Sequence, residues 1–437
     1  MTEEPRKGRQ RRRLTATVTD LDVGRQRALL VGVVTKRDSV ADGEASLEEL
    51  ARLTDTAGSE PVDEVLVRRD SPDPALFIGK GKANEIAGDV AALDIDVVVF
   101  DNELSPAQQR NLNEQFHVDV VDRTALILDM FAQHASSKDG MLQVELAQHR
   151  YRLPRLRGKG TQLSRLGGGI GTRGPGETQL ETDRRRILDR VRKIEHQLKD
   201  MAGSRDTRSK ARRRQGLPLV ALVGYTNAGK STLFNALTAA DVLVEDQLFA
   251  TLDSTVRKLE LPGGMAALAS DTVGFVRRLP HQLVESFRAT LEEVQDADLL
   301  LHVVDASEDD PDRQAEAVRS VLGEIGAGEL PELVVLNKID AASRAALARL
   351  RELNPDAVPV SALEGAGLPT LLDAIVGELS KGSIEVDLLI PYSHGDVVDR
   401  LYRLGEVIKR TDEAAGTRIA ARIPSGEMPR FATFLSE

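Results

Sequence analysis

Cysteine and tryptophan are absent from this chain of 437 residues, and aromatic residues make up only 3% of it. Without cysteine the chain can form no disulfide, no thiolate metal site and no cysteine nucleophile. The scarcity of aromatic rings argues against base stacking as a mode of nucleic-acid recognition. No apolar run approaches the roughly 20 residues that span a bilayer, and the basic N-terminus lacks the apolar segment of a secretory signal. We therefore expect a cytosolic protein with no membrane span, and a partial association with a membrane surface stays open.

The net charge of −11 conceals one strongly basic stretch. Residues 146–216 hold 20 Lys/Arg and 7 Asp/Glu, a local charge of +13, which leaves 38 basic and 62 acidic residues in the rest of the chain. A basic block in an acidic chain indicates one surface that faces a polyanion.

Alternating strand and helix patterns organise two parts of the chain. Over residues 25–123 the alternation predicts an N-terminal domain with an open α/β sheet. Residues 217–381 alternate again, and their continuous apolar strands indicate a parallel sheet covered on both faces. Residues 382–437 form a short α+β domain. The expected strands are residues 28–34, 62–67, 97–100, 219–223, 299–304, 333–336 and 358–360, and the expected helices of the first domain are residues 46–53, 83–93 and 105–116.

The region between these domains, residues 124–202, has no strand pattern. Apolar residues at spacings of three, four and seven predict one stripe of a long helix: Leu180, Ile187, Val191, Ile194, Leu198 and Met201. A partner stripe on Leu142, Leu146 and Leu153 predicts a helical hairpin. Its tip, residues 153–176, is crowded with Gly, Arg and Lys, which is typical of a mobile, positively charged loop. The polar residues 203–216 are expected to be a linker, and residues 1–24 a basic disordered tail.

The most specific motif is G-x-x-x-x-G-K-S at residues 224–231, between an apolar strand and a helical pattern at 232–237. Glycine lets the backbone wrap phosphates without Cβ clashes, and the following helix adds its positive end. Lys230 is expected to neutralise the β- and γ-phosphates, and the Ser231 hydroxyl to ligate Mg²⁺. The expected phosphate-binding residues are Gly224, Tyr225, Thr226, Asn227, Ala228, Gly229, Lys230 and Ser231.

A second motif indicates which base is bound. Asn337, Lys338, Ile339 and Asp340 follow the strand at 333–336. The Asp340 carboxylate can accept hydrogen bonds from N1–H and the exocyclic amine of guanine, whereas adenine has an acceptor at N1 and no such amine. Lys338 can lie along the base. We therefore expect GTP or GDP as the ligand, with backbone N–H groups offered to guanine O6 by Ser361, Ala362 and Leu363.

Two further segments are expected to respond to the γ-phosphate, because its loss would release both of them. The D-x-x-G run Asp271, Thr272, Val273 and Gly274 would hold Mg²⁺ through water at Asp271 and reach the γ-phosphate with the Gly274 N–H. The upstream switch is expected at Phe249, Ala250, Thr251, Leu252 and Asp253. Thr251 would be the second hydroxyl ligand of Mg²⁺, and Thr255 is an alternative. The residues expected to act in hydrolysis are Lys230, Thr251 and Gly274, and those expected at the metal are Ser231, Thr251 and Asp271.

Phe275 follows this run at the position where many GTPases carry a glutamine that orients the attacking water. A phenylalanine side chain can neither donate nor accept that hydrogen bond. We expect slow intrinsic hydrolysis that a partner accelerates. If Phe275 is only a core residue, slow intrinsic hydrolysis is still expected.

Together with the run G-P-G-E-T-Q-L-E-T-D at 174–183 and the segments 76–82 and 100–105, these motifs resemble the HflX family of translational GTPases from about residue 25 to the end. The resemblance implies binding to the large ribosomal subunit, dissociation of stalled or idle ribosomes under stress, and GTP hydrolysis stimulated by the ribosome. It also implies that the loop at 153–176 reaches toward the peptidyl transferase region. The basic block suits phosphate and shape contacts to folded rRNA, and the side chains expected there are Arg155, Arg157, Lys159, Arg165 and Arg173. We expect a monomer away from the ribosome.

Two other functions stay open at this point. A GTPase of ribosome assembly or RNA maturation would need a separate catalytic constellation, and the chain has no cysteine and only seven scattered histidines. A GTP-dependent ribosome-silencing factor with little hydrolysis is compatible with Phe275. In addition, the G-K-G-K run at 79–82, after an expected strand at 75–78, is either a strand–helix turn or a second phosphate-binding turn, and the family's N-terminal domain has been associated with ATP binding or RNA remodelling.

Overall fold

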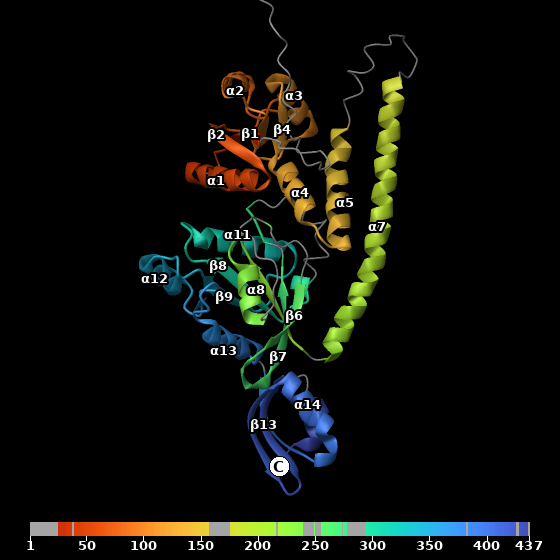
Figure 1. Cartoon of the computed structure of the whole chain (residues 1–437), viewed down its shortest axis with the longest axis vertical. Coiled ribbons are helices and arrows are strands. Elements are labelled where there is room, and N and C mark those ends of the chain that lie inside the picture. Colours follow the sequence, from red (N-terminus) through yellow and green to blue (C-terminus); the bar gives the residue numbers. More distant parts are fainter. Residues whose placement is uncertain are drawn as a thin grey trace, which may run out of the picture. The chain divides into compact units, whose positions relative to one another are not determined.

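The computed structural model describes residues 25–36, 39–156, 175–215, 217–238, 249, 255–272, 274–277, 293–381, 383–424 and 428–435. For some of these, mainly 175–180 and 204–215, only the backbone is described. The chain divides into two compact units, the first ending at His196 and the second beginning at Gln197. Each unit has its own sheets and its own apolar core (Figure 1).

The sheet of the first unit has four parallel strands in the order β2-β1-β3-β4. They are β1 (Gln26–Val34), β2 (Ser59–Arg68), β3 (Val97–Phe100) and β4 (Asp119–Asp122). The central strands β1 and β3 are almost wholly buried, as in sheets covered on both faces. The predicted α/β fold is thus confirmed, with one added strand: β4 is four residues long and begins and ends with aspartate, so it carries little strand signal. The helices of this layer are α1 (Val40–Thr56), α2 (Lys80–Ala92) and α3 (Pro106–Phe116).

The strand expected at residues 75–78 is wrong. The Asp73 carboxylate accepts the amides of Ala75 and Leu76, each at 2.8 Å, and Phe77 has a left-handed φ of 62°. Residues 73–77 form a tight turn that is closed by an isolated bridge between Asp73 and Phe77, and the segment is not a strand of the sheet. The Phe77 ring packs edge-on against Phe100 with ring centroids 6.3 Å apart, so the turn is fixed to the core. The G-K-G-K run therefore begins in a turn, and α2 starts at its second residue.

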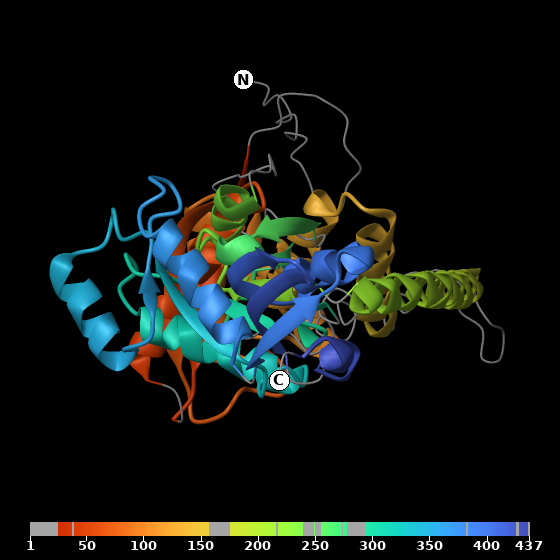
Figure 2. The same ribbon diagram turned by 90° about the horizontal axis from the view of Figure 1, so that it is seen from below.

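Three helices follow the sheet: α4 (Arg123–His134), α5 (Lys138–Arg155) and α7 (Pro175–Gln215). Figures 1 and 2 both show α5 beside α7. Two ion pairs join them: Arg190 forks onto Glu145 with two bonds of 2.6 Å, and Arg150 contacts Glu195 at 3.0 Å. Ile194 of the predicted stripe is fully buried. The expected pairing of two helices is confirmed for their described residues.

The expected linker at 203–216 is a further difference, because α7 continues through Gln215. Residues 204–215 contain no proline and no glycine, and five of these twelve residues are arginine, a good helix former. A polar composition excludes burial of the segment, and it does not exclude a helix.

The second unit contains a six-stranded sheet in the order β10-β9-β8-β5-β7-β6, parallel except for β6. Its strands are β5 (Leu219–Gly224), β6 (Thr255–Glu260), β7 (Ala266–Asp271), β8 (Leu299–Asp305), β9 (Glu332–Asn337) and β10 (Val358–Pro359). Its helices are α8 (Lys230–Thr238), α11 (Pro311–Glu324), α12 (Arg344–Leu353) and α13 (Leu368–Leu379), with the 3₁₀ turn η1 (Pro262–Gly264). Strands β5 and β8 are buried along their whole length, which confirms the predicted parallel sheet.

The C-terminal part of this unit is a three-stranded antiparallel sheet in the order β11-β13-β12, as expected of an α+β segment. It consists of β11 (Ser383–Ile390), β12 (Glu406–Glu413) and β13 (Gly416–Pro424), with helices α14 (Gly395–Leu404) and α15 (Met428–Phe431) and the 3₁₀ turns η2 (Tyr392–His394) and η4 (Ala432–Phe434). Its apolar core joins Leu388, Leu401, Ile419 and Phe431, all buried. Figure 1 shows α14 lying along one face of the sheet.

Candidate functional site

The loop between β5 and α8 has two glycines that no other residue can replace without strain. Gly224 has φ 152° and Gly229 φ 85°. A Cβ on Gly224 would collide with the Val303 carbonyl oxygen, and one on Gly229 with the Asn337 amide nitrogen. The loop is therefore packed directly against the ends of β8 and β9.

The Lys230 side chain turns back over this loop. Its Nζ donates to the carbonyl oxygens of Gly224 at 3.1 Å and Tyr225 at 2.7 Å. Burial lowers the pKa of Lys230 to about 8; Asp271 raises it and Lys338 lowers it further. An added anion would offset the desolvation of this buried ammonium, whose hydrogen bonds to the described residues go to two carbonyl groups.

The Ser231 hydroxyl donates to Asp271 Oδ2 at 2.7 Å. Ser231 is the second residue of α8 and Asp271 ends β7, so the fold brings together two residues 40 positions apart. Asp271 is fully buried. A hydroxyl and a carboxylate are hard oxygen ligands of the kind that Mg²⁺ takes beside phosphates.

The other D-x-x-G residues have different surroundings. Thr272 Oγ1 donates to the Leu222 carbonyl at 2.6 Å, which ties β7 to β5. Gly274 lies against the loop: a Cβ there would be 3.0 Å from Thr226 Cα and 3.1 Å from Lys230 Nζ. The Phe275 side chain is buried, with 3% exposed, so it belongs to the core.

The base-recognition motif connects three loops. Asn337 Nδ2 donates to the Ala228 carbonyl at 2.9 Å, and its Oδ1 accepts the Ala362 amide at 3.0 Å. Lys338 has a left-handed φ of 60°, and its Nζ contacts Asp305 Oδ2 at 2.7 Å. Asp340 and Leu363 are exposed, Ile339 is half-buried, and Ser361 is fully buried. Asn337 therefore holds the phosphate loop and the segment at 361–363 together, and Asp340 stands outside this framework.

Asp305 was missed by the sequence reasoning. It ends β8 and fixes Lys338, and it also accepts the amide of Ser307 at 2.9 Å. An acidic residue directly after an apolar strand of a parallel sheet was the available signal, since such strand ends form ligand sites.

Part of the first switch and of the expected RNA-binding set lies outside the described residues. Phe249 is buried and has a left-handed φ of 61°. Thr255, the alternative to Thr251, begins β6 and is paired with Asp271 in the sheet register. The residues outside the description are Ala250, Thr251, Leu252, Asp253, Val273, Arg157, Lys159, Arg165 and Arg173.

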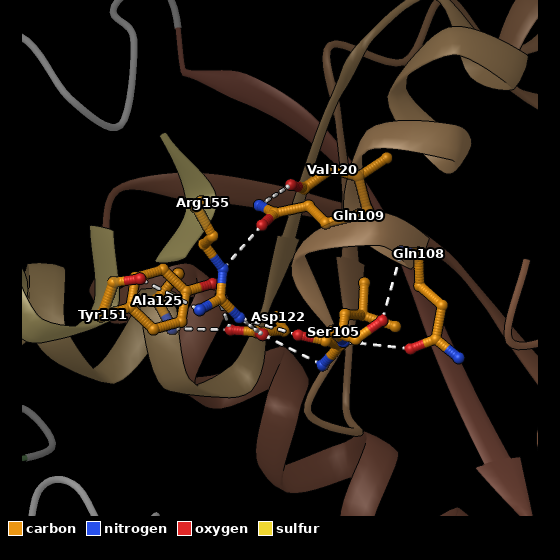
Figure 3. Close-up of polar contacts among 9 residues, drawn as sticks. Ser105, Gln108, Gln109, Val120, Asp122, Ala125, Tyr151 and Arg155 are labelled. Carbon is orange, nitrogen blue, oxygen red and sulfur yellow. Dashed lines mark hydrogen bonds and ion pairs between the residues drawn. The ribbon is translucent and has the colours of Figure 1, made fainter. Parts of the chain in front are cut away.

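Arg155 is the one described member of the expected RNA-binding set, and its side chain is hydrogen-bonded to other residues of the first unit (Figure 3). Its guanidinium donates to Gln109 Oε1 at 2.8 Å, to the Leu104 carbonyl at 2.7 Å and to Asp122 Oδ2 at 3.1 Å. It also stacks over the Tyr151 ring, 3.5 Å from the centroid. With these contacts the Arg155 side chain is 14% exposed and is bonded to residues of its own unit, so this position is not the exposed cation that the sequence predicted.

Figure 3 also shows that Asp122 is the centre of this cluster. Its fully buried carboxylate accepts the amides of Leu104 and Ala125, the Tyr151 hydroxyl and the Arg155 guanidinium. Burial raises the pKa of the Tyr151 phenol, and the charge of Asp122 raises it further. No sequence motif pointed to this cluster, because its residues come from separate elements.

Within the described residues, no helix combines the length and the hydropathy that a membrane span requires.

Three family descriptions match consecutive parts of the chain. Residues 44–132 match "GTP-binding GTPase N-terminal", residues 134–212 match "GTP-binding GTPase Middle Region", and residues 219–338 match "50S ribosome-binding GTPase". Together they follow the order of the N-terminal sheet, the helices and the six-stranded sheet.

Relatives match over almost the whole length. GTPase HflX of Caldanaerobacter subterraneus subsp. tengcongensis is 46% identical over 415 residues, which are 94% of this chain and 94% of the relative. GTPase HflX of Escherichia coli (strain K12) is 44% identical over 92% of this chain and 94% of its own. A GTP-binding protein from the archaeon Sulfolobus solfataricus, solved with GDP, is 24% identical over 82% of this chain and 99% of its own, with a TM-score of 0.41, which is too low to support an argument about the site. The chain therefore belongs to the HflX family of GTPases and is a GTP-hydrolysing enzyme.

Proposed function

We propose that this protein is a GTP-dependent switch that binds the large ribosomal subunit and dissociates stalled or idle ribosomes under stress. The observation that carries the nucleotide part is the convergence of Lys230, the Ser231–Asp271 pair and Asn337 around one glycine loop. In this proposal the loop at 224–231 binds the phosphates, Asp340 and the segment at 361–363 bind guanine, and Gly274 senses the γ-phosphate. The GTPase activity of the family makes guanine nucleotide the ligand.

Mg²⁺ fits this site because a hydroxyl and a buried carboxylate already meet at 2.7 Å where the phosphate loop begins its helix. Ser231 would hold the ion directly, Asp271 through water, and Thr251 would complete the set. The ion would supply a positive charge that neutralises the triphosphate during transfer. The chain's own contribution is Lys230, whose buried ammonium is held in the loop by two carbonyl groups.

The ribosomal part rests on two supports. The family matched by residues 219–338 is described as a 50S ribosome-binding GTPase. In addition, α7 carries exposed Arg184, Arg185, Lys193 and Lys199, which make no hydrogen bond or ion pair with the described part of the chain. Exposed cations spread along one helix suit contacts with the phosphates of folded rRNA. These α7 residues replace Arg155 in our proposal, beside Arg157, Lys159, Arg165 and Arg173 of the loop.

The test removes three of these charges. In the Arg184→Ala, Arg185→Ala, Lys193→Ala triple variant, we expect weaker binding to isolated large subunits and a salt dependence of log K that is flatter by about two units. The affinity for GDP should stay the same, because α7 is not part of the nucleotide site. Binding is measured by co-sedimentation over a series of salt concentrations.

The matched control is the triple variant Arg344→Ala, Arg349→Ala, Arg351→Ala, which removes three exposed arginines from α12. It loses the same charge and should bind the subunit as the wild type does. If the two triple variants bind equally well, the ribosomal proposal fails while the GTPase assignment stands.

Hydrolysis should be slow alone and faster with the large subunit, because Phe275 is buried and brings no polar group to the attacking water. Single-turnover hydrolysis with and without large subunits, read beside subunit separation on a gradient, measures this. The alternative of a silencing factor predicts stable binding, little hydrolysis and no separation. We also propose that the protein is monomeric away from the ribosome.

A further inference from the structure

Three hydrogen bonds join the phosphate loop to the segment that follows Gly274. The Thr226 amide donates to the Phe275 carbonyl at 2.7 Å, and the Phe275 amide donates to the Gly224 carbonyl at 3.1 Å. The Arg277 amide donates to the Tyr225 hydroxyl at 2.9 Å. The first two form a parallel bridge between main chains. The third depends on a side chain, so a single substitution can remove it.

Tyr225 is well placed for this contact. It is buried, with 7% exposed, so its ring is held by packing and its hydroxyl reaches a fixed point. Phe275 and Val276 on the facing segment are also buried, with 3% and 1% of their surface exposed. The hydrogen bond is therefore partly shielded from water, which strengthens it relative to a fully exposed one.

The segment is thus held at both of its ends. Before Gly274, the Asp271 carboxylate is bonded to Ser231 at 2.7 Å. After Gly274, the Arg277 amide is bonded to Tyr225. Between these anchors the Gly274 backbone lies against the loop, so close that a Cβ would stand 3.1 Å from Lys230 Nζ. The position of the Gly274 amide relative to the phosphate loop depends on both anchors.

We propose that Tyr225 is a positioning residue for GTP hydrolysis: its hydroxyl holds the Arg277 amide and thereby keeps the Gly274 amide beside Lys230, facing the γ-phosphate. Backbone placement carries more weight here than in GTPases with a glutamine, because Phe275 offers no hydrogen bond to the attacking water. The proposal rests on the role that Gly274 has in the proposed function, and it does not depend on the ribosome.

The test is Tyr225→Phe in the full chain, which removes one oxygen and keeps the ring. Single-turnover GTP hydrolysis without ribosomes should slow about three- to tenfold, the range for one neutral hydrogen bond. Affinity for a non-hydrolysable GTP analogue should fall by a similar factor, whereas affinity for GDP should stay within about twofold, since GDP has no γ-phosphate. The melting temperature of the nucleotide-free chain should fall by at most about a few degrees, since one partly buried hydrogen bond is lost.

Tyr392→Phe is the matched control. The Tyr392 hydroxyl donates to the Glu413 carbonyl at 2.8 Å in the C-terminal sheet, so the variant also loses one tyrosine hydrogen bond to the backbone. It should hydrolyse GTP at the wild-type rate. The proposal is overturned if Tyr225→Phe hydrolyses at an unchanged or higher rate, or if its GDP affinity falls by as large a factor as the rate. In either case Mg²⁺-dependent GTP hydrolysis by the wild type would leave the proposed nucleotide function intact.

Discussion

Residues of the same motif differ in burial, and buried and exposed members make different contacts. In the run Asn337–Asp340, the Asn337 side chain is buried and bonded to Ala228 and Ala362, whereas Asp340 is exposed. Asn337 therefore holds neighbouring loops together, and Asp340 is exposed, as its proposed role in binding guanine requires. Two hydroxyl groups differ in a similar way. The Thr272 hydroxyl donates to the Leu222 main-chain carbonyl, whereas the Ser231 hydroxyl donates to the Asp271 carboxylate.

Replacing Asp340 by Asn should lower the affinity for GDP at least about 100-fold, because two charge-assisted hydrogen bonds to guanine are lost or mismatched. The fold should be unaffected, since Asp340 is exposed. Calorimetry with GDP and Mg²⁺ measures the change. Asp356→Asn, an equally exposed aspartate of the same unit, is the control. Equal GDP binding by both variants would contradict the assignment of Asp340.

Asp129 of α4 predicts a pH dependence of stability. Burial raises its pKa from 3.8 to about 6, and Arg152 opposes the shift. The folded state then binds a proton that the unfolded state has already lost, so stability falls as pH rises from about 4 to about 6. Asp129→Asn should remove this fall and raise the free energy of unfolding at pH 7 by about 2 to 3 kcal/mol.

Denaturant unfolding at pH 4.5 and pH 7, for the wild type and Asp129→Asn, checks this prediction. The two proteins should differ at pH 7 and converge at the lower pH. Asp183→Asn is the control, because Asp183 lines the same cavity of about 720 Å³. A wild type whose stability does not change between these pH values would contradict the expected protonation of Asp129.

At the scale of elements, polar side chains decide how helices meet strands. Asp122 ends β4, caps α4 through the Ala125 amide, and binds Tyr151 and Arg155 of α5. One buried carboxylate thus connects a strand with two helices. The hairpin is joined differently, by the partly exposed pairs Glu145–Arg190 and Arg150–Glu195, which contribute little to stability individually.

Asp122→Asn should lower the free energy of unfolding by about 3 kcal/mol or more, because it leaves the buried part of Arg155 without its counter-ion. Hydrogen exchange should rise first in α4 and in the last turns of α5, where its donors lie. Asp119→Asn at the exposed start of the same strand is the control and should be neutral. Unchanged protection of α5 in Asp122→Asn would show that the cluster does not fix this helix.

At the scale of the whole molecule, one helix belongs to both compact units. The boundary between His196 and Gln197 falls inside α7, which continues to Gln215. A continuous helix transmits torsion and bending that a flexible linker does not. The basic block of 146–216 also lies largely on this element, so the surface proposed to meet RNA and the connection to the GTPase unit are the same structure.

Inserting two glycines between Gln197 and Leu198 should lower the stimulation of GTP hydrolysis by large subunits several-fold. Glycine disfavours the helix interior by about 1 kcal/mol per residue, so the connection would become flexible. Intrinsic hydrolysis should not change, because the nucleotide site lies wholly in the second unit. The control places the same two glycines between Asp356 and Ala357, in a loop. Full stimulation of the first variant would contradict a role for helix continuity.

The amino-acid sequence by itself determined the two α/β sheets, the helical pairing, and the phosphate and base motifs. These signals are local: a glycine loop, a strand or a helix stripe is specified by residues within about ten positions of one another. Only the tertiary structure showed that Arg155 is bound to Asp122 and Leu104, that Asp305 fixes Lys338, and that Tyr225 reaches Arg277. These partners are 33 to 52 positions apart. They meet because strand order and helix packing bring distant segments together, and no local pattern in the chain records which of them will touch.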